Sequence, residues 1–87
     1  MIKHTMKTIF GKSDRKFMVR FSRGREKMIC IEDLRLRYDY LSENELLKMM
    51  HKAKLSSDGK WLIFNDEIEL SADAVYLHQP QESESCQ

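Results

Sequence analysis

The stretch Phe17-Met18-Val19-Arg20-Phe21 decides the fold, because it alternates with the period of a β-strand. Its first, third and fifth residues lie on one face of an extended chain, and the other two lie on the opposite face. The polar segment 22–25 follows and contains one glycine, which suits a tight turn. Residues 27–31 then resume extended, β-branched character, with Ile29 and Ile31 on the buried face. The sequence therefore predicts an antiparallel hairpin.

Strand patterns also occur on both sides of this hairpin. Thr8-Ile9-Phe10 indicates a short strand before it. Further along the chain, Asp58-Gly59 favours a turn between paired strands. Residues 61–64 are apolar on both faces, as is typical of a central strand. Residues 67–70 alternate cleanly, so we expect them to complete a second hairpin with 61–64.

The helical signals lie between and after the two hairpins. Ser42-Glu43-Asn44-Glu45 fits a capping box and predicts a helix over about residues 43–53. Ser71 is suited to cap a short helical turn over 72–77. The predicted fold class is α+β, with a small, mainly antiparallel sheet made from a β-hairpin, a helix, a β-hairpin and a short C-terminal helical turn. The apolar stripe expected on the longer helix comprises Leu46, Leu47, Met50 and Ala53.

The length of 87 residues suits one domain. We expect a single α+β domain over residues 1–78 and a disordered C-terminal tail over 79–87, which has no large apolar residue. No apolar run approaches the roughly 18 residues that span a bilayer, and residues 1–7 lack the apolar stretch of a signal peptide. Two cysteines are too few for a disulfide scaffold. We therefore expect a cytoplasmic protein without membrane contact.

The sequence contains no convincing enzyme active site. His4, His51 and His78 are scattered and have no cysteine or carboxylate at a metal-ligand spacing. Glu67 and Glu69 share a strand face, but their alternation with apolar residues makes that the solvent face. The three glycines stand alone, so no glycine-rich phosphate loop is formed. We expect no catalytic residues, no metal and no cofactor.

The charges are divided unevenly along the chain, although the net charge is only +1. Residues 1–37 hold eleven Lys and Arg against four Asp and Glu, whereas residues 38–87 hold four Lys against ten Asp and Glu. The basic half includes the predicted N-terminal hairpin. Its cations can dock on another protein or bind the phosphates of a nucleic acid, or they can merely keep an exposed strand soluble. The candidate binding residues are Lys16, Arg20, Arg23, Arg25 and Lys27.

Several short motifs resemble the small bacterial "domain of unknown function 2442" family over about residues 15–78. The first is Val19-x-Phe21-x-Arg23-Gly24 leading to Asp33-Leu34, and the second runs from Asp58-Gly59 to Asp73-x-Val75-Tyr76. The chain departs from the family pattern at Arg23, where Asp or Asn is usual, and at Glu67, which replaces a glycine. The resemblance implies a cytoplasmic protein with a β-β-α-β-β core, and members are often encoded beside small toxin-like proteins. It implies no catalytic residues.

Two functions from different classes follow as hypotheses. The favoured one is a non-enzymatic binding or regulatory protein, antitoxin-like, that acts through a protein partner. The alternative is a nucleic-acid-binding regulator that uses the basic N-terminal hairpin and therefore binds in a salt-dependent way. Both a monomer and a homodimer are compatible with the sequence.

Overall fold

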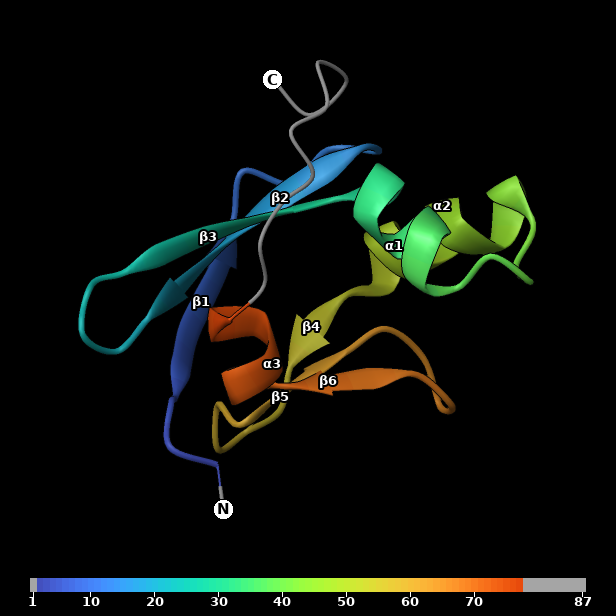
Figure 1. The fold of residues 1–87 in the computed structure, drawn as a ribbon. Helices are drawn as coiled ribbons and strands as arrows, with labels where there is room; N and C mark the ends of the chain where they lie inside the picture. Colours follow the sequence, from blue (N-terminus) through green and yellow to red (C-terminus); the bar gives the residue numbers. More distant parts are fainter. Residues whose placement is uncertain (1, 78–87) are drawn as a thin grey trace.

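The alternating stretch 17–21 forms the middle of a three-stranded antiparallel sheet in the computed structural model, which describes residues 2–77 (Figure 1). The strands β1 (Met6–Phe10), β2 (Lys16–Phe21) and β3 (Glu26–Cys30) lie in the order β1-β2-β3. The predicted hairpin is β2–β3, and the predicted short strand before it is β1. Each strand is paired with its neighbour in sequence, as expected of short polar connections.

The two faces of this sheet differ because its side chains alternate. Phe17 lies opposite Ile29 in the β2–β3 register, and both are buried in the core. On the other face, Phe10, Met18 and Met28 form one row across the three strands. These three side chains are only half-buried and lie outside the core cluster. The sheet therefore packs one face against the remaining elements.

Helix α1 (Ile31–Arg37) directly follows β3 and was not predicted. The expectation that Ile31 continues the strand is wrong, because the chain turns into the helix after Cys30, although Ile31 is buried as expected. Cys30 occupies the N-cap position, and its side chain makes no capping hydrogen bond. The start of this helix therefore lacks the polar residue that usually marks one.

Helix α2 (Glu43–Lys52) confirms the predicted capped helix. The Ser42 hydroxyl accepts from the Glu45 amide at 3.2 Å, and the Glu45 carboxylate accepts from the Ser42 amide at 3.3 Å. The buried side chains are Leu46, Met49 and Met50, with Ala53 just beyond the helix. Met49 thus takes the buried place predicted for Leu47, which is half-buried.

A second antiparallel sheet follows, in the order β4 (Lys54–Leu55), β5 (Trp61–Ile63), β6 (Glu69–Ser71). The central strand predicted over residues 61–64 is confirmed as β5, although it ends at Ile63, and the strand predicted over 67–70 begins two residues later, as β6. Ser71 caps helix α3 (Ala72–Tyr76) by accepting from the Ala74 amide at 3.1 Å, as predicted. The α+β fold class is confirmed, with the antiparallel strands of residues 2–77 divided between two small sheets.

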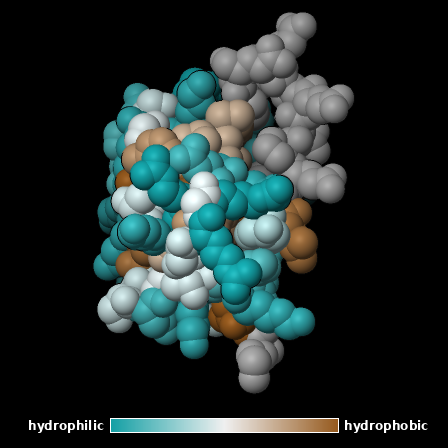
Figure 2. Space-filling view, turned by 90° about the vertical axis from the view of Figure 1, so that its left-hand side faces the viewer, coloured by the Kyte–Doolittle hydropathy of each residue, from teal (hydrophilic) through white to brown (hydrophobic). Residues whose placement is uncertain are grey.

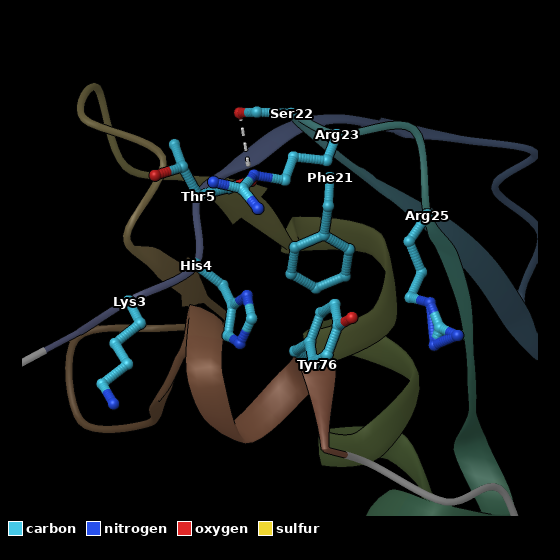
Figure 3. Close-up of a pocket in the computed structure, with 8 residues that line it drawn as sticks. All are labelled: Lys3, His4, Thr5, Phe21, Ser22, Arg23, Arg25 and Tyr76. Carbon is cyan, nitrogen blue, oxygen red and sulfur yellow. Dashed lines mark hydrogen bonds between the residues drawn. The ribbon is translucent and has the colours of Figure 1, made fainter.

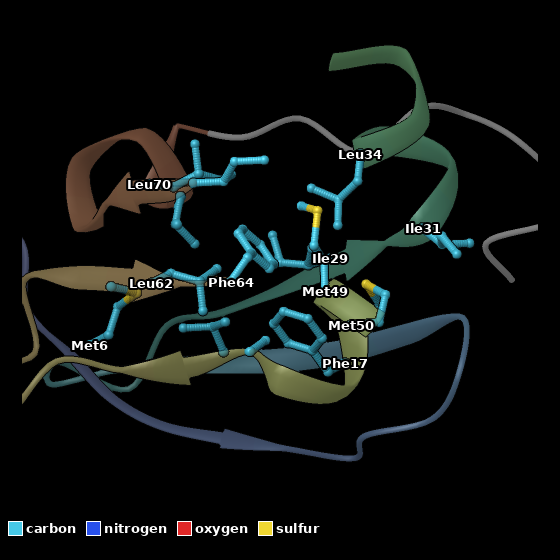
Figure 4. Packing of buried hydrophobic residues seen from close by; sticks show 14 of the residues in the cluster. Met6, Phe17, Ile29, Ile31, Leu34, Met49, Met50, Leu62, Phe64 and Leu70 are labelled. Atoms are coloured by element: carbon cyan, nitrogen blue, oxygen red, sulfur yellow. The ribbon is translucent and has the colours of Figure 1, made fainter. Parts of the chain in front are cut away.

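One hydrophobic core lies between the two sheets and the helices (Figure 4). The side chains of Phe17 and Phe64, one from each half of the chain, are almost fully buried and their ring centroids are 6.4 Å apart. Within residues 2–77, no helix is long and apolar enough to cross a membrane. The predicted tail, residues 79–87, lies outside the described residues.

Candidate functional site

Arg20 is exposed on the outer face of β2, but its charge is already compensated. Its guanidinium lies 2.8 Å from the Glu26 carboxylate on β3, the strand partner in register with it. The same guanidinium lies 4.7 Å from the centroid of the Phe10 ring. Both contacts hold the side chain against its own sheet, so Arg20 offers little net charge to a ligand.

The two lysines proposed as binding residues are separated by the strand register. Lys16 lies opposite Cys30 and Lys27 lies opposite Val19, so the two side chains belong to different faces of the sheet. Both are half-buried. The predicted basic set therefore does not form one continuous surface.

Arg23 and Arg25, at the hairpin turn, do share a site with residues from elsewhere in the chain. They line a pocket of about 460 Å³ that the N-terminal segment and helix α3 complete (Figure 3). We call it the hairpin pocket. Its lining residues are Lys3, His4, Thr5, Phe21, Ser22, Arg23, Arg25 and Tyr76.

An aromatic cluster forms the floor of the hairpin pocket. The His4 and Tyr76 rings are stacked, with centroids 3.8 Å apart and an interplanar angle of 6°. The buried Phe21 ring meets Tyr76 edge-on at 5.2 Å. Tyr76 lies between His4 and Arg25, whose guanidinium is 5.4 Å from the Tyr76 centroid (Figure 3). A cation at this distance from an aromatic ring is attracted to its face.

Hydrogen bonds donated by backbone amides hold the three segments of the pocket together. The Asp73 carboxylate, in α3, accepts from the Lys3 amide at 2.9 Å and from the His4 amide at 2.8 Å. The Ser22 amide donates to the Thr5 carbonyl at 2.9 Å. The hydrogen bond from the Lys3 amide is the largest cause of the lowered pKa of Asp73; desolvation acts in the opposite direction, and the hydrogen bond from the His4 amide adds to the lowering.

The chemistry of the hairpin pocket is cationic. Lys3, Arg23 and Arg25 are all exposed, and the eight lining residues include no carboxylate. Figure 2 looks onto the side of the molecule that carries the hairpin turn, and most of that side is hydrophilic with small apolar areas between. Cations above an aromatic floor are suited to bind an anion that also carries apolar groups.

Another pocket, of about 540 Å³, lies near β5 and β6 but combines both signs of charge. It contains Lys52 and Lys54 together with Asp66 and Glu69. Two lysines and two carboxylates give the lining no net charge, so this pocket favours neither an anion nor a cation. In the described part of the chain, no group of three His, Cys, Asp or Glu side chains could hold a metal ion.

The structure thus brings together Arg23 and Arg25 from the predicted set and separates them from Lys16, Arg20 and Lys27. Sequence reasoning missed Lys3, His4 and Tyr76 as pocket residues. These residues join the pocket through contacts across about seventy positions, for example from Lys3 to Asp73. No local pattern in the sequence could have indicated them.

Comparison with known proteins identifies no relative: no family model, curated protein or solved structure matches this chain. The resemblance to the family of unknown function therefore stays a prediction.

Proposed function

We propose that this chain is a small non-enzymatic binding protein of the cytoplasm that acts by docking on a protein partner, in the manner of an antitoxin or a regulatory subunit. The hairpin pocket carries the proposal, because it presents exposed cations next to partly apolar surface. Acid–base catalysis needs groups with separated proton affinities that converge on a substrate. The pocket instead combines cations with aromatic rings, and such side chains are suited to bind a partner.

The pattern of ion pairs favours a protein partner over nucleic acid. Arg15 pairs with Glu32, and Arg20 pairs with Glu26, so two of the basic residues along the sheet are compensated. A nucleic acid presents a dense line of phosphates and favours an extended row of uncompensated cations. The uncompensated arginines of the hairpin are instead concentrated at one pocket. The second candidate function is a nucleic-acid-binding regulator that uses the hairpin. Its support is that the exposed cations Arg23 and Arg25 can bind phosphates.

The test is an affinity purification of the tagged chain from its native host with two matched variants. The pocket variant combines Arg23→Ala with Arg25→Ala. The control combines Lys7→Ala with Lys48→Ala, which removes the same charge from exposed positions outside both pockets. We expect a stoichiometric protein to copurify with the wild type and the control, but not with the pocket variant, and to resist nuclease treatment.

Recovery of no stoichiometric protein would contradict the proposal. Recovery that depends on nucleic acid, together with retention on heparin that falls with salt, would favour the second candidate instead.

A further inference from the structure

We infer that the hairpin pocket is a preorganised anion site whose ligand is a pair of neighbouring carboxylates on an acidic peptide segment of the partner. This inference rests on the proposed function and specifies the chemistry of its contact. Three features of the pocket support it: the position of Arg25 against the Tyr76 ring, the absence of a carboxylate among the lining residues, and the contacts of His4 and Arg25 with the faces of the Tyr76 ring.

The positions of His4 and Arg25 are fixed before any ligand arrives. Both side chains contact Tyr76, one by stacking at 3.8 Å and the other at 5.4 Å from the ring centroid. The backbone of His4 is also held by its amide hydrogen bond to Asp73. A long cationic side chain normally loses rotamer freedom when it binds a ligand, and this cost is reduced when the side chain is already held in place.

An anion can enter the pocket without displacing an ion pair. Within residues 2–77, no salt bridge involves Lys3, Arg23 or Arg25. The carboxylate of Asp73 lies beside the N-terminal segment of the pocket, and its oxygens already accept hydrogen bonds from the amides of Lys3 and His4. Guanidinium groups donate to a carboxylate through charge-assisted hydrogen bonds, which are stronger than neutral ones.

The aromatic floor distinguishes a peptide from a nucleic acid. Tyr76 lies between His4 and Arg25, and Phe21 is buried with its ring directed at the Tyr76 edge (Figure 3). Proteins that bind single strands commonly stack bases on open aromatic faces, and the Tyr76 faces are occupied. The volume of about 460 Å³ also lies in the range of pockets for compact ligands rather than long grooves.

The experiment is a titration of the ¹⁵N-labelled full chain, followed by amide chemical shifts, with three probes at low salt. The probes are a capped peptide of eight glutamates, the same peptide made of glutamines, and an oligothymidylate with the same charge as the glutamate peptide. We expect the glutamate peptide to bind at least about tenfold more tightly than either other probe, since charge-assisted bonds and the closed rings both favour it. Its shifts should concentrate at residues 3–5, 21–25 and 76.

Two variants make the result specific to the pocket. Arg23→Ala with Arg25→Ala should weaken the glutamate peptide by about tenfold or more, because both guanidinium donors are lost. Lys7→Ala with Lys48→Ala should change the affinity of the glutamate peptide by less than about twofold, since these lysines do not line the pocket and salt screens their charges from a ligand bound there. If both variants weakened binding of the glutamate peptide equally, the affinity would depend only on net charge, and the inference would be overturned.

The oligonucleotide and the purification separate this inference from the proposed function. Oligothymidylate binding as tight as that of the glutamate peptide would overturn both. A different outcome is that a partner protein copurifies in a way that depends on Arg23 and Arg25, but the glutamate peptide does not bind. This outcome would overturn the assignment of carboxylates as the ligand and leave the proposed function standing.

Discussion

The carbonyl oxygen of Gly59 accepts a hydrogen bond of 2.7 Å from the backbone amide of Met6, and this contact joins the two sheets. Gly59 lies in the turn between β4 and β5, and Met6 is the first residue of β1. The glycine has φ +72°, and a Cβ atom at its position would collide with the carbonyl oxygen of Met6. The sheets approach each other at this point only because residue 59 has no side chain.

Gly59→Ala should therefore destabilise the protein by roughly 2–4 kcal/mol, because the left-handed backbone and the collision both oppose the new methyl group. Gly24→Ala is the matched control, since Gly24 also has positive φ but open space around it. It should cost about 1 kcal/mol. Urea denaturation followed by circular dichroism gives both values, and equal losses would contradict the role of the close approach.

Asp73→Asn should produce a stability difference that depends on pH. The pKa of Asp73 is lowered in the folded protein, chiefly by the hydrogen bond from the Lys3 amide. The carboxylate therefore stabilises the fold above its unfolded pKa of about 3.9, and this contribution disappears as the pH falls through the lower folded pKa. The free energies of unfolding of wild type and variant should differ at neutral pH and converge in acid.

Asp58 contributes to stability over the same acidic pH range, because its pKa is also lowered, chiefly by the hydrogen bond from the Ser56 hydroxyl. Because Asp58 is present in both proteins, its contribution cancels in the comparison. A difference between wild type and Asp73→Asn that persists unchanged at about pH 2, well below the ordinary carboxyl pKa, would show that the charge of Asp73 is not responsible.

Ser42→Ala should destabilise the protein by about 1 kcal/mol, because it leaves the Glu45 amide without its capping acceptor. Ser57→Ala is the control, since Ser57 is exposed in the turn that follows β4. The control should change the free energy of unfolding by less than about 0.5 kcal/mol. Thermal and urea unfolding of both variants provide the comparison, and equal stabilities of the two variants would contradict the capping role.

Lys12→Met should also cost about 1 kcal/mol, because it removes a cation from the end of a helix. The Lys12 ammonium donates to the carbonyls of His51 and Ala53 at 2.7 and 2.9 Å, which ties the β1–β2 loop to the end of α2. Lys7→Met, at an exposed position of β1, is the matched control. Hydrogen exchange should accelerate in the last turn of α2 for Lys12→Met alone. Equal exchange in both variants would contradict the stabilising role of the Lys12 hydrogen bonds.

Local patterns account for the elements that were predicted correctly. The alternation in 17–21 forms β2, Ser42 and Glu45 begin α2, and Ser71 begins α3. Each of these signals acts over a few residues, through the pleat of a strand or the unsatisfied amides of a first helical turn. Helix α1 escaped prediction because Cys30 supplies no side-chain cap to its first turn.

The sequence by itself determined the α+β class, the basic hairpin, the capped helix and the turn at Asp58-Gly59, since each depends on neighbouring residues. Only the tertiary structure decided which basic residues act together. It pairs Arg20 with Glu26, and it brings Arg25 to Tyr76, about fifty positions away. Packing between distant segments sets those distances, and a local pattern of charges and apolar residues contains no information about them.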